Sequence, residues 1–421
     1  MLAAHDNPKS GRKNQVPGVL NNLRVVEVSA YVAAPLGGMT LAQLGADLIQ
    51  ISPKSGRIDY NRWPQTDEGR SLYWAGLNKA KRSIRIDLAR PEGQELAASL
   101  IAGKEGDGGG ILMTNLPSRG WMSYEALKQR RDDLIMLKLT GNHNGSAAVD
   151  YTVNCASGFP MVTGDGTQPI NHAIPVWDIA TGLYLATGTL AAVQHRQATG
   201  KGQEVSIALS DVMLATVGNL GYIAEVQMTG RQRPAIGNHL YGGFGRDFAT
   251  KDGRAVMVAA FSDRQWQSLL RATGTEDRMP HVAAAMGVDL SDEAGRYAAR
   301  DAIAAVLAPW FAARTLADIR QAFEGSGVLW GPFQDFRQLV MEDARCSTAN
   351  PLFREAEQPG IGRYLTPHIP LAFGAAPHGD IVPAPALGQH SEAVLADVLG
   401  LSSGEIGRLF DAGLVAGPDR E

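Results

Sequence analysis

The sequence of 421 residues contains only two cysteines, Cys155 and Cys346. Two cysteines are too few for a disulfide framework or a cysteine-rich metal cage, and such low usage is typical of a reduced compartment. No run of about 18 apolar residues stands out, so we expect no membrane span. Residues 1–16 are polar and lack the apolar core of a signal peptide. We therefore expect a cytoplasmic protein without a metal site.

The chain also has little excess of charge of either sign. The formal net charge is −4, and 19% of the residues are charged against 44% that are hydrophobic, which is an ordinary composition for a soluble globular enzyme. So small a net charge gives no general attraction to nucleic acid or to anionic lipid, and we expect neither as a partner. The chain exceeds the length at which one core keeps growing, so we expect two domains.

A dinucleotide-binding fingerprint is missing. Residues 24–28 and 47–51 have the pattern of buried strands, and residues 35–44 that of a helix between them. This order predicts a parallel, Rossmann-like α/β sheet. The turn at residues 29–38 contains no G-x-G-x-x-G motif, which disfavours an NAD-dependent enzyme.

Strands and helices alternate as far as residue 228, with a glycine-rich insert at residues 103–110 that we expect to be flexible. A polar, helix-breaking linker then leads into a smaller α+β block. We predict a large domain over residues 1–228, a small domain over residues 229–340, and a return to the large domain over residues 341–421.

Asp178 stands where an extended segment meets a long apolar helix, which we expect to be central and buried. Free N–H groups and the helix dipole at such a position favour an ionised carboxylate. An ionised, half-enclosed carboxylate can attack an acyl group as a nucleophile. The alternative is that Asp178 only caps the helix, since Asp is a favoured residue at the N-cap position.

Two sets of polar residues lie where a ligand could bind. Asn115 and Arg119 follow a strand at residues 111–114, and ligands of open α/β sheets gather beyond the carboxyl ends of strands. The basic cluster at residues 78–82 has charges that suit a phosphate group. The alternative for this cluster is a solvated turn.

Seven motifs give the chain a resemblance to a known family. They are residues 23–28 (LRVVEV), 44–47 (LGAD), 78–84 (NKAKRSI), the segment around Asp178, 199–203 (TGKGQ), 242–245 (GGFG) and 387–390 (LGQH). In these motifs and their order the chain resembles the family III CoA-transferases, which include formyl-CoA and carnitine CoA-transferases and 2-methylacyl-CoA racemases. Residues 29–40, 73–79, 149–154 and 241–248 are more closely similar to the mesaconyl-CoA C1–C4 CoA-transferase group.

The resemblance implies a Rossmann-like large domain whose parallel sheet is formed from both chain ends, a smaller α+β domain, and an interlocked homodimer. It implies that Asp178 is the nucleophile and that coenzyme A enters as part of an acyl-CoA substrate, without a separate cofactor. The expected contacts with the substrate and its CoA portion are Tyr31, Val32, Ala33, Lys54, Ile86, Asp87, Asn115, Arg119, Gly242 and Gly243.

The implied reaction moves CoA from the C1 to the C4 carboxyl of mesaconyl-CoA through an anhydride and a thioester of Asp178. We expect oxyanion donors from backbone N–H groups at the helix start and in the loop at residues 242–245. Candidates for the free carboxylate of the substrate are Arg57, Arg62, His239 and Arg246.

Three alternative functions remain at this point: CoA transfer to a different dicarboxylate, racemisation of a 2-methylacyl-CoA, and CoA binding without chemistry. A racemase needs a proton carrier on each face of the α-carbon. The family's His position corresponds to Val149, and only His143 and His172 lie nearby in sequence, so transfer is favoured.

Overall fold

A computed structural model describes residues 18–377 and 379–419 and divides the chain into two compact units. Unit 1 comprises Met1–Ser157, His172–Met228 and Ala344–Glu421, apart from the residues outside the described ranges, and unit 2 comprises Gly158–Asn171 and Thr229–Asp343. Residues 158–171 were predicted to belong to the first domain. They join unit 2 because their backbone bonds there, as where Gly237 N–H donates to Gly164 O at 2.7 Å. The expectation for residues 1–16 lies outside the described part of the chain.

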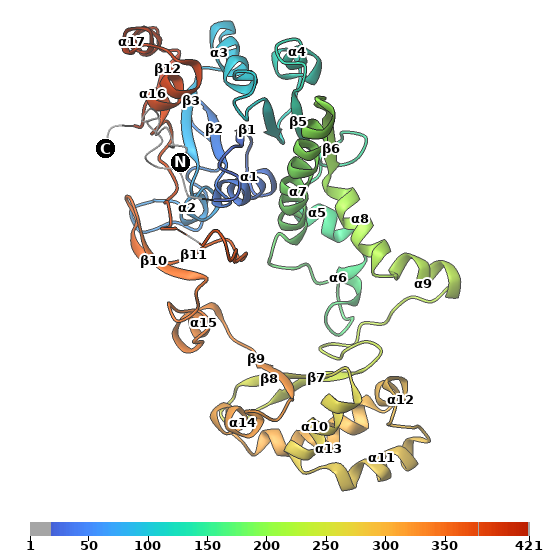
Figure 1. Ribbon diagram of the computed structural model, residues 1–421. Helices are drawn as coiled ribbons and strands as arrows, with labels where there is room; N and C mark the ends of the chain where they lie inside the picture. The colour runs from blue at the N-terminus through green and yellow to red at the C-terminus, as the bar shows by residue number, and fades with distance from the viewer. Residues whose placement is uncertain (1–17, 378, 420–421) are drawn as a thin grey trace, which may run out of the picture. The chain divides into compact units, whose positions relative to one another are not determined.

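Unit 1 is built on a seven-stranded sheet in the order β12-β3-β2-β1-β4-β5-β6 (Figure 1). Its strands are β1 (Arg24–Val28), β2 (Asp47–Pro53), β3 (Arg82–Ile86), β4 (Ile111–Thr114), β5 (Ile135–Thr140), β6 (Glu204–Ala208) and β12 (Val415–Ala416). All neighbouring strands pair in parallel except β12, which is antiparallel to β3. The predicted α/β class with a parallel sheet is confirmed, and the C-terminal part of the chain supplies an edge strand.

The central strands are buried along their length, as expected for a parallel sheet with helices on both faces. The helices of unit 1 are α1 (Ala33–Gln43), α2 (Leu72–Leu77), α3 (Pro91–Ala102), η1 (Gly120–Met122), α4 (Tyr124–Lys128), α5 (Asp150–Cys155), α7 (Val176–Thr199), α8 (Leu209–Asn219), α9 (Tyr222–Thr229, whose last residue falls in unit 2), α16 (Ser391–Val394), η3 (Leu395–Leu399) and α17 (Ser403–Asp411). A hairpin of β10 (Phe353–Gln358) and β11 (Gly362–Pro367) completes the unit.

Helix α7 crosses α1 at a close contact between glycines. A Cβ on Gly182 would lie 2.7 Å from the carbonyl oxygen of Ala33, and one on Gly37 would lie 2.8 Å from that of Gly182. Because neither glycine has a side chain, the first turn of α1 and the second turn of α7 meet backbone to backbone. This contact brings Asp178, one turn earlier on α7, toward the turn that follows β1.

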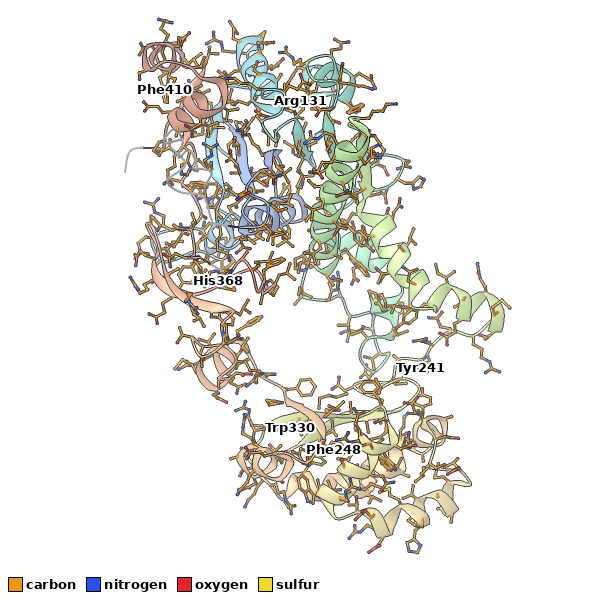
Figure 2. The ribbon with its side chains drawn as sticks, in the orientation of Figure 1. Arg131, Tyr241, Phe248, Trp330, His368 and Phe410 are labelled. Carbon is orange, nitrogen blue, oxygen red and sulfur yellow. The ribbon has the colours of Figure 1, made fainter. Side chains whose placement is uncertain are left out.

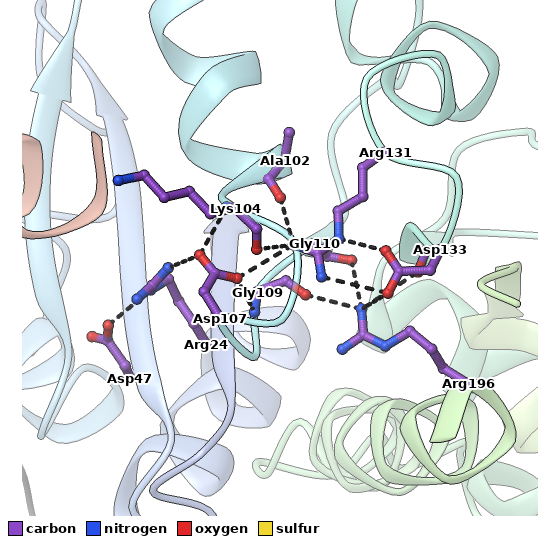
Figure 3. Close-up of polar contacts among 10 residues, drawn as sticks. All are labelled: Arg24, Asp47, Ala102, Lys104, Asp107, Gly109, Gly110, Arg131, Asp133 and Arg196. Carbon is purple, nitrogen blue, oxygen red and sulfur yellow. Dashed lines mark hydrogen bonds and ion pairs between the residues drawn. The ribbon is translucent and has the colours of Figure 1, made fainter. Parts of the chain in front are cut away.

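The other end of α7 is held by a polar network at the amino ends of the strands (Figure 3). Arg196 donates to Gly109 O at 2.9 Å, and the Asp107 carboxylate accepts from Arg24 at 2.6 Å and from the backbone of Lys104 and Gly109. The glycine-rich insert at residues 103–110 is therefore tied into the fold, and the prediction that it is flexible found no support. No local pattern in the sequence indicates that this insert is ordered, because the hydrogen-bond partners of Asp107 come close to it only in the folded chain.

By length and composition α7 is apolar enough to cross a bilayer, contrary to the expectation that no segment would be. The bent pair of α13 (Arg300–Ala312) and α14 (Leu316–Phe323) passes the same test only if it is counted as one span. In the structure one face of α7 is buried, including Leu185 and Ala186, whereas Leu183 and Tyr184 on its other face are about half exposed. The predicted central, fully buried helix is thus buried on one side only within a single chain.

The basic cluster at residues 78–82 does not form an open phosphate site. Lys81 is fully buried and donates to Glu27 Oε2 at 2.9 Å, Pro35 O at 2.9 Å and Asn78 Oδ1 at 3.0 Å. Arg82 pairs with Asp47 at 2.7 Å. Two of the cluster's cations are therefore used inside the protein, where they join β1, α1, β2 and β3.

Unit 2 is an α+β unit around an antiparallel sheet of β7 (Phe244–Ala249), β8 (Ala255–Ala260) and β9 (Leu329–Pro332). Its helices are α6 (Phe159–Val162), α10 (Asp263–Thr273), η2 (Glu276–Arg278), α11 (Met279–Met286), α12 (Glu293–Ala298), α13, α14 and α15 (Phe336–Glu342). Phe248 on β7 stacks on Phe311 of α13 with 4.3 Å between ring centroids (Figure 2). This aromatic core is independent of the core of unit 1.

Replacing Lys81 by Met should lower the free energy of unfolding by about 3–5 kcal/mol, because Glu27 then keeps a buried charge without its partner. Urea unfolding at pH 7 measures the loss. The double variant Lys81→Met with Glu27→Gln removes both charges and should recover most of it. Equal stability of the single and double variants would show that the buried pair does not matter.

Candidate active site

The carboxyl ends of four neighbouring parallel strands carry most of the residues predicted to touch the substrate. Tyr31, Val32 and Ala33 follow β1, Lys54 follows β2, Ile86 ends β3 with Asp87 next, and Asn115 and Arg119 follow β4. Because β3, β2, β1 and β4 are adjacent and parallel, these residues share one edge of the sheet. Ligands of open α/β sheets bind beyond this edge.

The turn after β1 is fixed from two sides. Asn115 Oδ1 accepts from Ala30 N–H at 2.9 Å, and its Nδ2 donates to Ala30 O at 2.7 Å. Tyr31 has a φ of 70°, an uncommon left-handed conformation for a residue with a side chain. Its N–H donates to Asp59 Oδ2 at 2.9 Å. Asn115 therefore shapes the turn with both ends of its amide, whereas Tyr31 presents a ring that is 42% exposed.

The other predicted contacts lie beside the C-terminal segment. Lys54 Nζ donates to Gly413 O at 2.9 Å, and Asp87 N–H donates to Leu414 O at 2.8 Å. Arg119 is exposed at the start of η1. Lys54, Ile86 and Asp87 thus form one group around the residue 413–414 turn, a neighbour that the local sequence did not indicate.

Asp178 lies in the first turn of α7, but it does not cap the helix. Asp150, at the start of α5, extends its Oδ2 atom to the N–H groups of Trp177 at 2.7 Å and Asp178 at 3.0 Å. Its Oδ1 atom accepts from His172 Nε2 at 3.1 Å. Among the residues that the structure describes, neither carboxylate oxygen of Asp178 has a hydrogen-bond partner. The capping interpretation of Asp178 is therefore wrong, and its carboxylate is available for chemistry.

The protonation of Asp178 also differs from the expectation. Burial, reinforced by the negative charge of Asp150, raises the pKa of Asp178 to about 6, and the positive charge of Arg62 partly opposes this rise. The expected stabilisation of the ionised form by free N–H groups is lost because Asp150 occupies them. At pH 7 about nine in ten molecules still carry the ionised carboxylate. A desolvated carboxylate with few hydrogen bonds is a stronger nucleophile than a solvated one.

Two buried polar atoms near Asp178 have no hydrogen-bond partner in the described part of the chain. They are Tyr73 Oη, on α2, and Thr181 Oγ1, one turn after Asp178. Burial raises the pKa of Tyr73 to about 12, and the charges of Arg62, Asp59 and Asp178 also act on it. Sequence reasoning missed both residues, because no local pattern shows that α2 approaches the start of α7. Buried groups without partners are the places where a substrate can bond.

Gly242 and Gly243 lie in unit 2, in the turn before β7, together with His239, which contacts Asp301 at 3.2 Å. A Cβ on Gly242 would meet no atom within 4 Å, and its φ of 83° requires glycine. The loop is therefore an open backbone turn, whose place relative to Asp178 stays a prediction.

Replacing Asp150 by Asn should move the acid limb of the pH–rate profile to lower pH. The Asn oxygen still accepts from the helix N–H groups, but the negative charge that raises the pKa of Asp178 is removed. If the ionised carboxylate is the attacking group, activity should persist at pH values where the wild type has lost it. Asp150→Ala, which also removes the cap, should cost about 1 kcal/mol of stability in addition. An unchanged acid limb in Asp150→Asn would contradict this account.

Replacing Asp178 by Asn should stabilise the fold in neutral solution. The pKa of Asp178 is raised from 3.8 to about 6 on folding, so its ionisation opposes folding; the penalty is absent below pH 3.8, grows between these values and is complete above 6. The expected gain at pH 8 is roughly 2–3 kcal/mol. Urea unfolding at pH 4 and pH 8 tests this, and a variant that is less stable than wild type at pH 8 would refute it.

Comparison with known proteins gives the family of the chain. The family model of CoA-transferase family III matches residues 20–391. A 2-methylfumaryl-CoA isomerase from Chloroflexus aurantiacus is 54% identical over 96% of this chain and 99% of its own length. A succinyl-CoA:mesaconate CoA-transferase from Haloarcula hispanica is 27% identical over 92% of this chain and 98% of its own length. The crystal structure of a CaiB/BaiF family protein from Brucella suis covers 91% of this chain and 100% of that chain, with 25% identity and a TM-score of 0.74. The resemblance seen in the sequence is confirmed, and the chain belongs to CoA-transferase family III.

Proposed function

We propose that this protein moves CoA within one molecule, from the C1 to the C4 carboxyl of mesaconyl-CoA. The observation that carries the proposal is the Asp178 carboxylate, which is half-buried, has no partner in the described part of the chain and is mostly ionised at pH 7. The mesaconyl group is the 2-methylfumaryl group, so the 54% identity to a 2-methylfumaryl-CoA isomerase supports this substrate. An internal transfer leaves the elemental composition of the substrate unchanged, so the net reaction is an isomerisation.

The reaction proceeds through four acyl transfers that balance without added reagents. Asp178 attacks the C1 thioester carbonyl, the C–S bond breaks, and CoA thiolate leaves a mixed anhydride. The thiolate then attacks the aspartyl carbonyl of this anhydride. Mesaconate leaves, and an aspartyl-CoA thioester remains on the protein. The C4 carboxylate attacks this thioester and expels the thiolate again. In the last step the thiolate attacks the C4 carbonyl of the new anhydride and frees Asp178.

The CoA portion lies over the carboxyl ends of β3, β2, β1 and β4 in this proposal, against Tyr31–Ala33, Lys54, Ile86–Asp87 and Asn115–Arg119. Each step places negative charge on a carbonyl oxygen, which needs hydrogen-bond donors. The N–H groups of Trp177 and Asp178 are already used by Asp150 and do not serve as these donors. The expectation of oxyanion donors at the first N–H groups of α7 is thereby corrected, and the expectation for the Gly242–Gly243 backbone stays a prediction.

Two rival functions are less well supported. A racemase needs a second proton carrier, and Val149 occupies the family's His position, while His172 is engaged with Asp150. A module that binds CoA without chemistry would need Asp178 as a structural cap, and Asp150 fills that role. Transfer to an external dicarboxylate uses the same site, and the proposed internal transfer differs from it only in retaining the acid.

We further propose that the protein acts as an interlocked homodimer in the cytoplasm, with CoA entering only as part of the substrate and with no resident cofactor. Apolar side chains on the outer face of α7, α8 and α9 support a second subunit. They are at least one-third exposed in the single chain: Leu183, Tyr184, Leu190, Leu214, Leu220, Ile223 and Val226.

The test supplies mesaconyl-C1-CoA together with isotopically labelled free mesaconate. Internal transfer should form the C4 thioester without label, whereas exchange between molecules would bring label into it. Asp178→Asn should lower turnover by at least about 10³-fold, because the amide cannot form the anhydride. Hydroxylamine added during turnover should convert residue 178 to a hydroxamate in the wild type. Product formation with residue 178 unmodified would rule the mechanism out.

A further inference from the structure

Arg62 carries a guanidinium that is held in place but not neutralised. Its Cζ lies 5.5 Å from the ring centroid of Tyr31 and 5.4 Å from that of Tyr73, within the range of cation–π attraction. Its backbone is anchored because its O atom accepts from Ser71 Oγ at 2.6 Å. In the described part of the chain its side chain has no hydrogen bond and no ion pair. The guanidinium therefore keeps its five N–H donors for a ligand.

The other cations considered for the free carboxylate of the substrate are placed differently. Arg57 donates two hydrogen bonds to Asp59, at 2.8 and 2.7 Å, and both side chains are almost fully buried. His239 and Arg246 belong to unit 2. In the described part of unit 1, Arg62 is thus the candidate whose guanidinium makes no hydrogen bond at all, whereas Arg57 keeps only its buried Nη1 without a partner.

The charge of Arg62 reaches the nucleophile without being paired with it. It opposes the rise in the pKa of Asp178 and acts on Tyr73 in the same direction, yet no ion pair joins Arg62 to Asp178. The ring of Tyr73 contacts the same guanidinium, and its buried hydroxyl has no hydrogen-bond partner in the described residues. A cation and a hydroxyl donor close to the nucleophile form a setting for a small anion.

We propose that Arg62, held between Tyr31 and Tyr73, binds the carboxylate of the acyl group that is not bonded to CoA or to Asp178. This inference rests on the proposed function and deepens it. A planar guanidinium can bind a carboxylate through two parallel hydrogen bonds. The stacked rings restrict its motion, so less conformational entropy is lost on binding. Arg62 therefore selects short dicarboxylic acyl groups over monocarboxylic ones.

The same contact accounts for retention of the acid. While CoA is bonded to Asp178, the released mesaconate has no covalent link to the protein and carries two negative charges. Arg62 attracts the dianion more strongly than either monoanionic form. The acid can then exchange its ends at Arg62, so that the C1 carboxylate binds the guanidinium and the C4 carboxylate is presented to the thioester.

The experiment compares two thioesters in single turnovers with hydroxylamine trapping at Asp178. One is mesaconyl-C1-CoA, and the other is its C4 methyl ester, which lacks the negative charge. The rates are compared at pH 8, well above the pKa of Asp178, so that the loss of the Arg62 charge does not change the ionised fraction of the nucleophile. There Arg62→Ala should slow labelling by the acid thioester about 10- to 100-fold and leave labelling by the methyl ester unchanged. Arg62→Lys keeps the positive charge but loses the two parallel N–H donors of the guanidinium. Its labelling rate with the acid thioester should lie between those of the wild type and Arg62→Ala. Arg363→Ala, at a surface arginine that is 63% exposed, is the matched control and should change neither rate.

Binding of free mesaconate, measured by calorimetry on wild type and Arg62→Ala, gives a readout that does not depend on catalysis. Weaker binding to the variant, at an unchanged melting temperature, is expected. Equal binding, or an equal loss of rate with both thioesters, would overturn the role of Arg62 and leave the proposed function standing. If neither thioester labels Asp178 in the wild type while mesaconate binding still requires Arg62, the proposed function fails and the carboxylate site remains.

Discussion

The site depends on one interaction, the capping of α7 by the carboxylate of Asp150. A helix start has free N–H groups that must find acceptors, and an aspartate in the first turn would ordinarily supply one. Here the acceptor comes from another helix, α5, and is itself held by His172. Asp178 is relieved of the capping role and stands beside a second negative charge in a partly desolvated place. Burial and the charge of Asp150 raise the pKa of Asp178, and because Asp150 supplies the cap, the Asp178 oxygens are left without hydrogen bonds in the described part of the chain.

The rest of unit 1 serves to hold this arrangement in register with the sheet. Arg196 fixes the far end of α7 at the amino ends of the strands, and Gly37 with Gly182 lets α7 approach α1 closely. Beneath the site, Lys81 and Glu27 join the first turn of α1 to three strands. The start of α7 and the turn after β1 are therefore positioned by backbone contacts and buried charges, which yield little to thermal motion.

Asp150 and Arg62 have complementary effects on the same carboxylate. Asp150 raises the pKa of Asp178, and Arg62 lowers it. The balance keeps Asp178 mainly ionised near neutral pH without a permanent partner. An ion pair with Arg62 would have lowered the pKa further but would also have occupied the oxygens that attack in the proposed mechanism. The cation instead rests on Tyr31 and Tyr73, and the loop that carries it is tied to the turn after β1 through Asp59.

By itself the sequence determined the strand–helix alternation, the parallel sheet, the absence of a dinucleotide motif and the family, because hydrophobic periodicity and contiguous motifs are local properties. It also marked Asp178 as a residue at a helix start. Only the tertiary structure decided that Asp150 caps this helix, that the cations of residues 78–82 are used in the interior, and that residues 158–171 join unit 2. Those outcomes depend on partners that are distant in the chain. Lys81 and its partner Glu27 are 54 positions apart, and Gly237 bonds to Gly164, which is still further away in the sequence. Secondary-structure propensity depends on neighbours along the chain, whereas protonation and side-chain hydrogen bonding depend on neighbours in space.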